Sequence, residues 1–182
     1  MEHEMIDLLD ESGQKIGVID KAVAHKEGQW HRSVHVWIVN DNNQILLQHR
    51  CKEKTFFANC WDCAFAGHIG AGESSLESAL REGEEEIGLK LTKSDLEFLF
   101  TFKDRLVWKD KISNEFVDVY LIRKNININK LVYQEEEVDD VKWMDIDEFF
   151  DNILNKKGDF LFHGEEEYLR LRGILVKKEV LI

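Results

Sequence analysis

The chain has 182 residues, of which 43% are hydrophobic and 10% aromatic, and its 36 acidic and 24 basic residues give a formal net charge of -12. This much apolar material excludes a disordered chain and fits one folded domain, which we expect to span residues 1–182. The acidic excess argues against binding to nucleic acid or to an anionic membrane surface, because both need a basic face.

The sequence also favours a cytoplasmic protein with no membrane association. No run approaches the roughly 18 apolar residues of a membrane span, and the acidic start MEHEMIDLLD is unlike a signal or transit peptide. Cys51, Cys60 and Cys63 are odd in number, which favours reduced thiols over a disulfide scaffold. CWDC has the CxxC spacing, but the sequence has no second pair of cysteines. Ordinary buried or half-buried thiols are therefore favoured over zinc or redox chemistry.

The first part of the chain predicts two hairpins with a short helix between them. Alternating residues on both sides of DESG indicate strands near Met5 to Leu9 and Lys15 to Ile19. One or two helical turns follow, with Asp20 as N-cap and Gly28 as stop, so that this N-terminal unit ends at about residue 28. SVHVWIVNDNNQILLQHR then predicts a hairpin of core strands around the turn NDNN.

The second half predicts two long strands, a short strand and terminal helices. LEFLFTFKDRLVWKD and EFVDVYLIRK are strand-like and are joined by a polar connection at Lys111 to Asn114. VDDVKWMDIDEFFDNILNK predicts a strand to Met144 and then a helix capped by Asp145 or Asp147. EEEYLRLRGILVKKEV predicts a last helix, so helices occupy about residues 145–180 and the fold class is α+β (mixed α/β).

GHIGAGESSLESALREGEEEIGL predicts a helix of about thirteen residues that starts after Ser74 or Ser75 and stops at Gly88. It places three carboxylates on an arc of about 100°, nearly opposite its apolar side: Glu82, Glu85 and Glu86. The apolar side is formed by Leu76, Leu80, Gly83 and Ile87. A solvated acidic face is the plain alternative. Three glycines before the helix imply a tight loop that brings backbone close to a ligand, which favours a metal–phosphate site.

The spacing of eight residues in this stretch of 23 resembles the Nudix box position for position. They are Gly67, Glu73, Arg81, Glu82, Glu85, Glu86, Gly88 and Leu89. Gly83 departs from the pattern, since an aliphatic or small side chain is usual there. The resemblance implies the Nudix fold, a mixed β-sheet sandwiched between α-helices. It also implies a divalent-metal-dependent hydrolase that cleaves a diphosphate bond in a nucleoside diphosphate derivative or related organic diphosphate.

The same resemblance assigns roles within the box. Ligands of Mg²⁺, or of Mn²⁺, are implied at Glu82, Glu85, Glu86 and Gly67. Arg81 resembles the residue that holds a glutamate in place, and structural support is implied at Glu73, Gly72 and Gly88. The base that takes the proton of the attacking water is left open between Glu86 and three rivals from a later loop, namely Glu135, Glu136 and Glu137.

WHRSVHVWIVN, ILLQHR, KTFFANCW and AGHIGAGE also resemble the Nudix branch that includes type 1 isopentenyl-diphosphate isomerases. Those enzymes hold a divalent ion with histidines and glutamates, and comparable ligands here are His25, His31 and His68 with Glu82 or Glu86. The isomerase cysteine precedes Gly-His, where this chain has Ala66, and Cys63 is too far away to replace it. A hydrolase is therefore favoured over an isomerase and over a non-catalytic Nudix-fold ligand sensor.

Other side chains have weaker expected roles. Phosphate contacts are open to the basic residues Arg32, Arg50, Lys52 and Lys54. Base stacking or pocket lining is open to Trp30, Trp61 and Trp108, whereas His35 and His49 are expected to be partly buried strand residues. Residues Asp104 to Glu115 and the tail after Phe160 are expected to shape the pocket for a small diphosphate substrate. The sequence leaves open a homodimer formed through the N-terminal hairpin or a strand edge.

Overall fold

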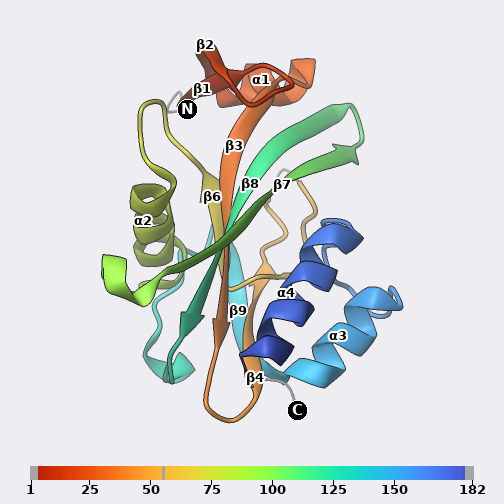
Figure 1. Ribbon diagram of the computed structural model, residues 1–182. Helices are drawn as coiled ribbons and strands as arrows, with labels where there is room; N and C mark the ends of the chain where they lie inside the picture. The colour runs from red at the N-terminus through yellow and green to blue at the C-terminus, as the bar shows by residue number, and fades with distance from the viewer. Residues whose placement is uncertain (1–3, 55, 179–182) are drawn as a thin grey trace.

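The computed structural model describes residues 4–54 and 56–178, which form one mixed sheet with helices on both sides (Figure 1). The strands are β1 (Met5–Leu9), β2 (Lys15–Asp20), β3 (Trp30–Val39), β4 (Gln44–Arg50), β5 (Trp61–Asp62), β6 (Phe65–His68), β7 (Glu97–Trp108), β8 (Lys111–Arg123) and β9 (Val138–Asp145). The helices are α1 (Lys21–Glu27), α2 (Ser75–Ile87), α3 (Ile146–Leu154) and α4 (Glu165–Lys177), with short 3-10 turns at Lys93–Asp95 and Ile128–Lys130. This arrangement confirms the predicted α+β fold.

Strand β3 is the centre of the sheet. It runs parallel to β8 over its whole length, with His31 opposite Glu115. Its other edge is shared, because β6 pairs with residues 33–36 of β3 and β4 pairs with residues 38 and 39. Strands β4 and β6 therefore leave β3 at different points, and the side chains of α2 reach the sheet between them.

Two apolar clusters hold the layers together. On β3, Val34, Val36 and Ile38 face α2, as the alternation predicts, and the other face carries Trp37 and Val39. The α2 side also buries Ala79 and Ile87. The opposite side is filled by aromatic and aliphatic residues of α3 and α4, among them Phe149, Phe150, Tyr168, Leu171 and Leu175. In Figure 1, α2 lies on one flank of the sheet and the pair α3 and α4 lies on the other.

The predicted ends of α1 and α2 and the predicted start of α3 are confirmed, whereas α4 ends at Lys177 and the predicted end near residue 180 lies outside the described residues. Asp20 and Asp145 cap α1 and α3, and Ser74 caps α2. Gly28 and Gly88 end α1 and α2 with left-handed φ angles of 65° and 66°, which glycine adopts at little cost. None of the described helices is long and apolar enough to cross a membrane.

The polar connection predicted at Lys111 to Asn114 is wrong. Strand β8 already begins at Lys111, and the chain reverses two residues earlier, where Lys109 has a φ of 56°. The polar residues Ser113 and Glu115 belong to the strand because they face a polar cavity rather than solvent. A polar alternation of this kind looks like a loop when only the sequence is read.

Candidate active site

Two of the three α2 carboxylates lie on the buried side of the helix, which corrects the expected separation of acidic and apolar faces. Glu82 and Glu86 are 8% and 3% exposed and share the buried face with Gly83 and Ile87, whereas Glu85 is exposed. Glycine makes this burial feasible. A Cβ at Gly67 would lie 2.1 Å from the Glu82 carboxyl group, so only a residue without a side chain leaves room for Glu82 at this point of β6.

Glu86 occupies the space between β4 and β6. Its Oε2 accepts hydrogen bonds from Gln48 Nε2 at 3.1 Å and from the backbone N–H of Ala66 at 3.3 Å. Lys54 places its Nζ 3.6 Å from Glu86 Oε1 and also pairs with Glu137. Glu86 is thus bound by one amide side chain, one backbone amide and one ammonium group.

Arg81 connects the box residues to one another. Its Nη1 donates to Glu82 Oε1 at 2.8 Å and to Glu85 Oε2 at 3.0 Å. Its Nη2 donates to the carbonyl of His68 at 3.1 Å and to Glu73 Oε2 at 3.3 Å. Glu73 also accepts from Ser78 Oγ at 2.7 Å, so the loop before α2 is bound to the first turns of the helix.

The buried carboxylates repel one another. Burial, followed by the charge of Glu86, raises the pKa of Glu82 to about 7. Burial also raises the pKa of Glu86, although Lys54 opposes this shift. A set of oxygen donors with excess negative charge fits a hard divalent cation such as Mg²⁺. The three carboxylates are nevertheless paired with Arg81 and Lys54 rather than gathered around one point.

The expected histidines do gather, but with a different acid. Ligand atoms of His25, His31, His68 and Glu115 all lie within 4.8 Å of one another. Strand register explains the set: His31 is opposite Glu115 in the pairing of β3 with β8, and His68 is opposite Ser33 in the pairing with β6. The acid expected here, Glu82 or Glu86, is therefore replaced by Glu115, which the sequence reading had placed beyond a loop.

The pKa shifts of this histidine cluster differ between its members. Burial and the neighbouring His31 lower the pKa of His25 to about 4, and burial lowers the pKa of His68 well below its ordinary value. Burial would also raise the pKa of Glu115, but its contact with His31 holds it well below the ordinary value. Nε2 of His31 is buried, has no hydrogen-bond partner among the described residues, and lies 3.5 Å from Glu115 Oε1. Burial would lower the pKa of His31, but the hydrogen bond and charge of Glu115 raise it. The neutral imidazoles of His25 and His68 beside a carboxylate are a donor set for a divalent cation.

A third group of ionisable residues lies at the floor of the site, and the sequence analysis did not find it. Imidazole nitrogens of His163 lie 3.0 Å from Asp62 Oδ1 and 3.2 Å from Asp104 Oδ2. Arg50 donates to the other oxygen of Asp62 at 3.1 Å. Burial opposes the charged forms, but the pairing raises the pKa of His163 well above its ordinary value and lowers that of Asp62.

His35 belongs to this floor through α4. Its Nδ1 lies 3.1 and 3.2 Å from the two oxygens of Glu167, and Trp37 Nε1 donates to Glu167 at 2.9 Å. His35 is only 3% exposed and Glu167 is fully buried. Burial would raise the pKa of Glu167, but the charge and hydrogen bond of His35 lower it. The alternation that suggested a partly buried His35 did not reveal its partner, which is 132 residues away.

All three groups line one cavity of about 480 Å³. The predicted residues on its surface are His25, Arg50, Lys54, Gly67, His68, Arg81, Glu82, Glu85, Glu86, Glu136 and Glu137. Residues 104–115 and the tail after Phe160 contribute as expected, through Leu106, Lys111, Ser113, Glu115, Leu161 and His163. The apolar wall comes from Phe56, Phe57, Leu106 and Leu161.

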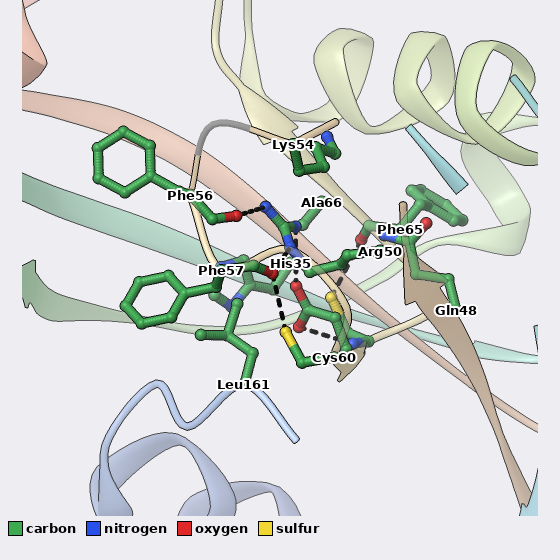
Figure 2. Close-up of polar contacts among 12 residues, drawn as sticks. His35, Gln48, Arg50, Lys54, Phe56, Phe57, Cys60, Phe65, Ala66 and Leu161 are labelled. Carbon is green, nitrogen blue, oxygen red and sulfur yellow. Dashed lines mark hydrogen bonds and ion pairs between the residues drawn. The ribbon is translucent and has the colours of Figure 1, made fainter. Parts of the chain in front are cut away.

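Several candidate residues lie elsewhere among the described residues. Arg32 pairs with Asp118, and the mostly exposed Lys52 pairs with Glu53, so neither lines the cavity. The cavity-lining residues include no tryptophan, although Trp108 packs on Phe57 with ring centroids 4.7 Å apart. Arg50 points its Nε and Nη2 at the carbonyls of Phe57 and Phe56, which ties the loop of these aromatic residues to β4 (Figure 2).

Comparison with known proteins identifies the family. The NUDIX domain family matches residues 29–163. Nudix hydrolase 3 of Arabidopsis thaliana is 43% identical over 86% of this chain. The match covers only about a fifth (21%) of the length of that relative. An isopentenyl-diphosphate Delta-isomerase of Pectobacterium atrosepticum is 31% identical over 81% of this chain and 79% of its own length. The crystal structure of DR0079 from Deinococcus radiodurans shares the fold, with a TM-score of 0.69 at 21% identity over 93% of this chain and 98% of that one.

The match extends over most of the chain, and the box residues, the mixed sheet and the cavity at α2 agree with it. The chain belongs to the Nudix hydrolase family.

Proposed function

We propose that this protein is a Mg²⁺-dependent enzyme that hydrolyses a diphosphate bond in a nucleoside diphosphate derivative or a related organic diphosphate. The observation that carries the proposal is the buried pair Glu82 and Glu86, whose pKa values are raised at the wall of the cavity. Two like charges confined this closely favour a divalent cation between them and a substrate that brings phosphate oxygens to complete its coordination.

Glu82, Glu85 and Glu86 would hold the cation, with the Gly67 backbone beside them. The cation supplies positive charge to the diphosphate and acidity to a water molecule. Arg81 keeps Glu82 and Glu85 in place, and Lys54 can contact a phosphate oxygen once it leaves Glu86 and Glu137. For the base that takes the water's proton, the candidates from the sequence reduce to Glu86, Glu136 and Glu137 on geometric grounds, since Glu135 does not line the cavity.

Isomerisation of an isopentenyl-type diphosphate is the second candidate. The cluster of His25, His31, His68 and Glu115 favours it, because the resemblance to the isomerases implies a histidine-held cation. The residue before Gly-His argues against isomerisation, because the side chain of Ala66 has no group that can donate or accept a proton. Cys63 is fully buried in the apolar core and donates its thiol to the carbonyl of Phe65 at 3.3 Å, away from the cavity.

A panel of nucleoside diphosphate derivatives, nucleotide sugars and isopentenyl diphosphate, incubated with Mg²⁺ or Mn²⁺, tests the proposal. We expect release of phosphate or nucleotide that is lost in Glu85→Gln and Glu86→Gln. Glu84→Gln is the matched control, because Glu84 is an exposed residue of the same helix that pairs with Lys90 at 3.4 Å. Full activity in Glu86→Gln would refute the proposal. Isomerisation without hydrolysis would favour the second candidate, and thermal stabilisation by a ligand without turnover would favour a sensor.

A further inference from the structure

The strongest observation outside the box is the pairing of His35 with Glu167. A carboxylate that receives Nδ1–H of an imidazole fixes the tautomer and the orientation of the ring, and it leaves Nε2 as the group that exchanges protons. Glu167 is itself fixed by Trp37 at 2.9 Å. Among the residues that the structure describes, His35 Nε2 has no hydrogen-bond partner, and His35 lines the cavity.

His35 lies on the face of the sheet away from α2, because Val34 and Val36 face α2, and its partner in β6 is Ala66. His35 is opposite Ala66 in the antiparallel pairing of β3 with β6, so the two side chains leave the sheet on the same face. The backbone N–H of Ala66 donates to Glu86 at 3.3 Å. His35 and Glu86 are therefore both neighbours of Ala66, and Figure 2 labels His35, Ala66 and Arg50. His35 and Ala66 both line the cavity, and His35 is 3% exposed.

We propose that His35, oriented by Glu167, is the catalytic base of the hydrolysis. This proposal rests on the proposed function and adds to it a residue outside the Nudix box. Nε2 of His35 accepts one proton from a water molecule, whose oxygen forms the new bond to phosphorus. The bond from phosphorus to the bridging oxygen breaks, and its electron pair leaves with the departing phosphate. The proton on His35 then passes to that phosphate or to solvent, which restores the imidazole.

The chemistry of the alternatives supports this choice. Glu86 is occupied by Lys54, Gln48 and the Ala66 amide, and Glu137 is paired with Lys54. Glu136 lines the cavity but is exposed, so it lacks the fixed orientation that Glu167 gives to His35. A metal ion at His35, His163 and Glu167 is the other reading of this cluster, since their ligand atoms lie within 4.8 Å of one another. That reading is less favourable, because both nitrogens of His163 already face Asp62 and Asp104.

Charged and titratable groups lie on the elements that pack against His35. They are Glu167 on α4, His163 in the tail, Asp62 on β5, Asp104 on β7 and Arg50 on β4. Glu167 lies 3.1 Å from His35 Nδ1, and the centroid of the His163 ring lies 4.3 Å from that of His35. A pH profile alone therefore cannot assign the base, and the test needs a chemical readout.

Chemical rescue provides that readout. In His35→Ala with Mg²⁺ present, we expect kcat to fall about 10²- to 10⁴-fold, as for loss of a general base, while KM changes little. Added imidazole should restore part of kcat by entering the space left in the cavity. Imidazoles of increasing basicity should restore progressively more, which follows from proton transfer in the rate-limiting step.

Two controls separate catalysis from structural support. Trp37→Phe removes the hydrogen bond from Trp37 to Glu167 but keeps the base His35. We therefore expect added imidazole to leave the kcat of Trp37→Phe unchanged. His49→Ala removes another strand histidine, which packs on Trp61 and pairs with Asp139 outside the cavity, and it should also show no rescue. Should His35→Ala fail to fold, His35→Gln replaces it, because glutamine is polar and similar in size to histidine. We expect this variant to show the same loss of kcat with unchanged stability.

Full kcat in folded His35→Ala or His35→Gln would overturn the proposal. A reduced kcat in His35→Ala that no imidazole restores, together with an equal loss in Trp37→Phe, would also overturn it by assigning the pair a structural role. Either result leaves the proposed function intact as long as Glu86→Gln abolishes hydrolysis. Full activity of Glu86→Gln would instead refute the proposed function itself.

Discussion

The α2 carboxylates and the floor of the cavity are both buried and ionisable, yet they differ in charge balance. At α2, Glu82 and Glu86 crowd like charges, and the pKa of Glu82 rises to about 7. At the floor, His163 lies between Asp62 and Asp104, and pairing stabilises the charged forms of His163 and Asp62. The pKa shifts of the two groups are opposite although both are buried. The charges of the floor therefore balance one another, whereas an added cation would stabilise the α2 carboxylates.

The largest expected effect comes from neutralising the α2 group. Glu86→Gln should reduce kcat about 10³-fold, as for loss of an electrostatic group at a reaction centre. The same change should raise stability, because Glu86 has a raised pKa and its buried charge is unfavourable at neutral pH. Activity assays and urea unfolding at pH 8 measure both. Lower stability in Glu86→Gln would show that the α2 group, like the floor, is already balanced.

Gly67→Ala tests the close approach of β6 to Glu82. The added Cβ would lie 2.1 Å from the Glu82 carboxyl group and must displace it. We expect Mn²⁺ affinity to fall about 10- to 100-fold, as for a shifted metal ligand. Gly173→Ala in α4 is the control, since a Cβ there meets nothing within 4 Å. Equal affinities in both variants would contradict the role of Gly67.

The smallest of these effects is a pH dependence of stability at the floor. The folded pKa of His163 lies well above the ordinary histidine value, so its contribution to stability is fully present below about pH 6.5 and is lost as the pH rises through the folded pKa. The stability difference between wild type and His163→Asn should therefore shrink by about 1.4 kcal/mol per pH unit above this point. Urea unfolding from pH 6 to 9 measures it, and parallel curves would show that His163 is not held charged.

Sequence reasoning predicted the α2 site better than the floor, and the physical reason is distance along the chain. The box lies within 23 residues, so helix periodicity and capping residues define its geometry locally. The histidine cluster required the register of β3 with β8, which brought in Glu115 across 84 residues of chain. The floor joins β3 to α4, and no local pattern marks the partner of His35. Local spacing also misplaced the buried side of α2, because only Gly67 on β6 makes room for Glu82.

The most direct test of the central claim is a Mn²⁺ titration followed by calorimetry in the background His31→Asn, which removes a ligand of the histidine cluster. The account predicts that this variant still takes up Mn²⁺, that Glu84→Gln added to it changes little, and that Glu86→Gln added to it abolishes the remaining uptake. Mn²⁺ binding that persists unchanged in the double variant with Glu86→Gln would contradict a cation site at the α2 carboxylates.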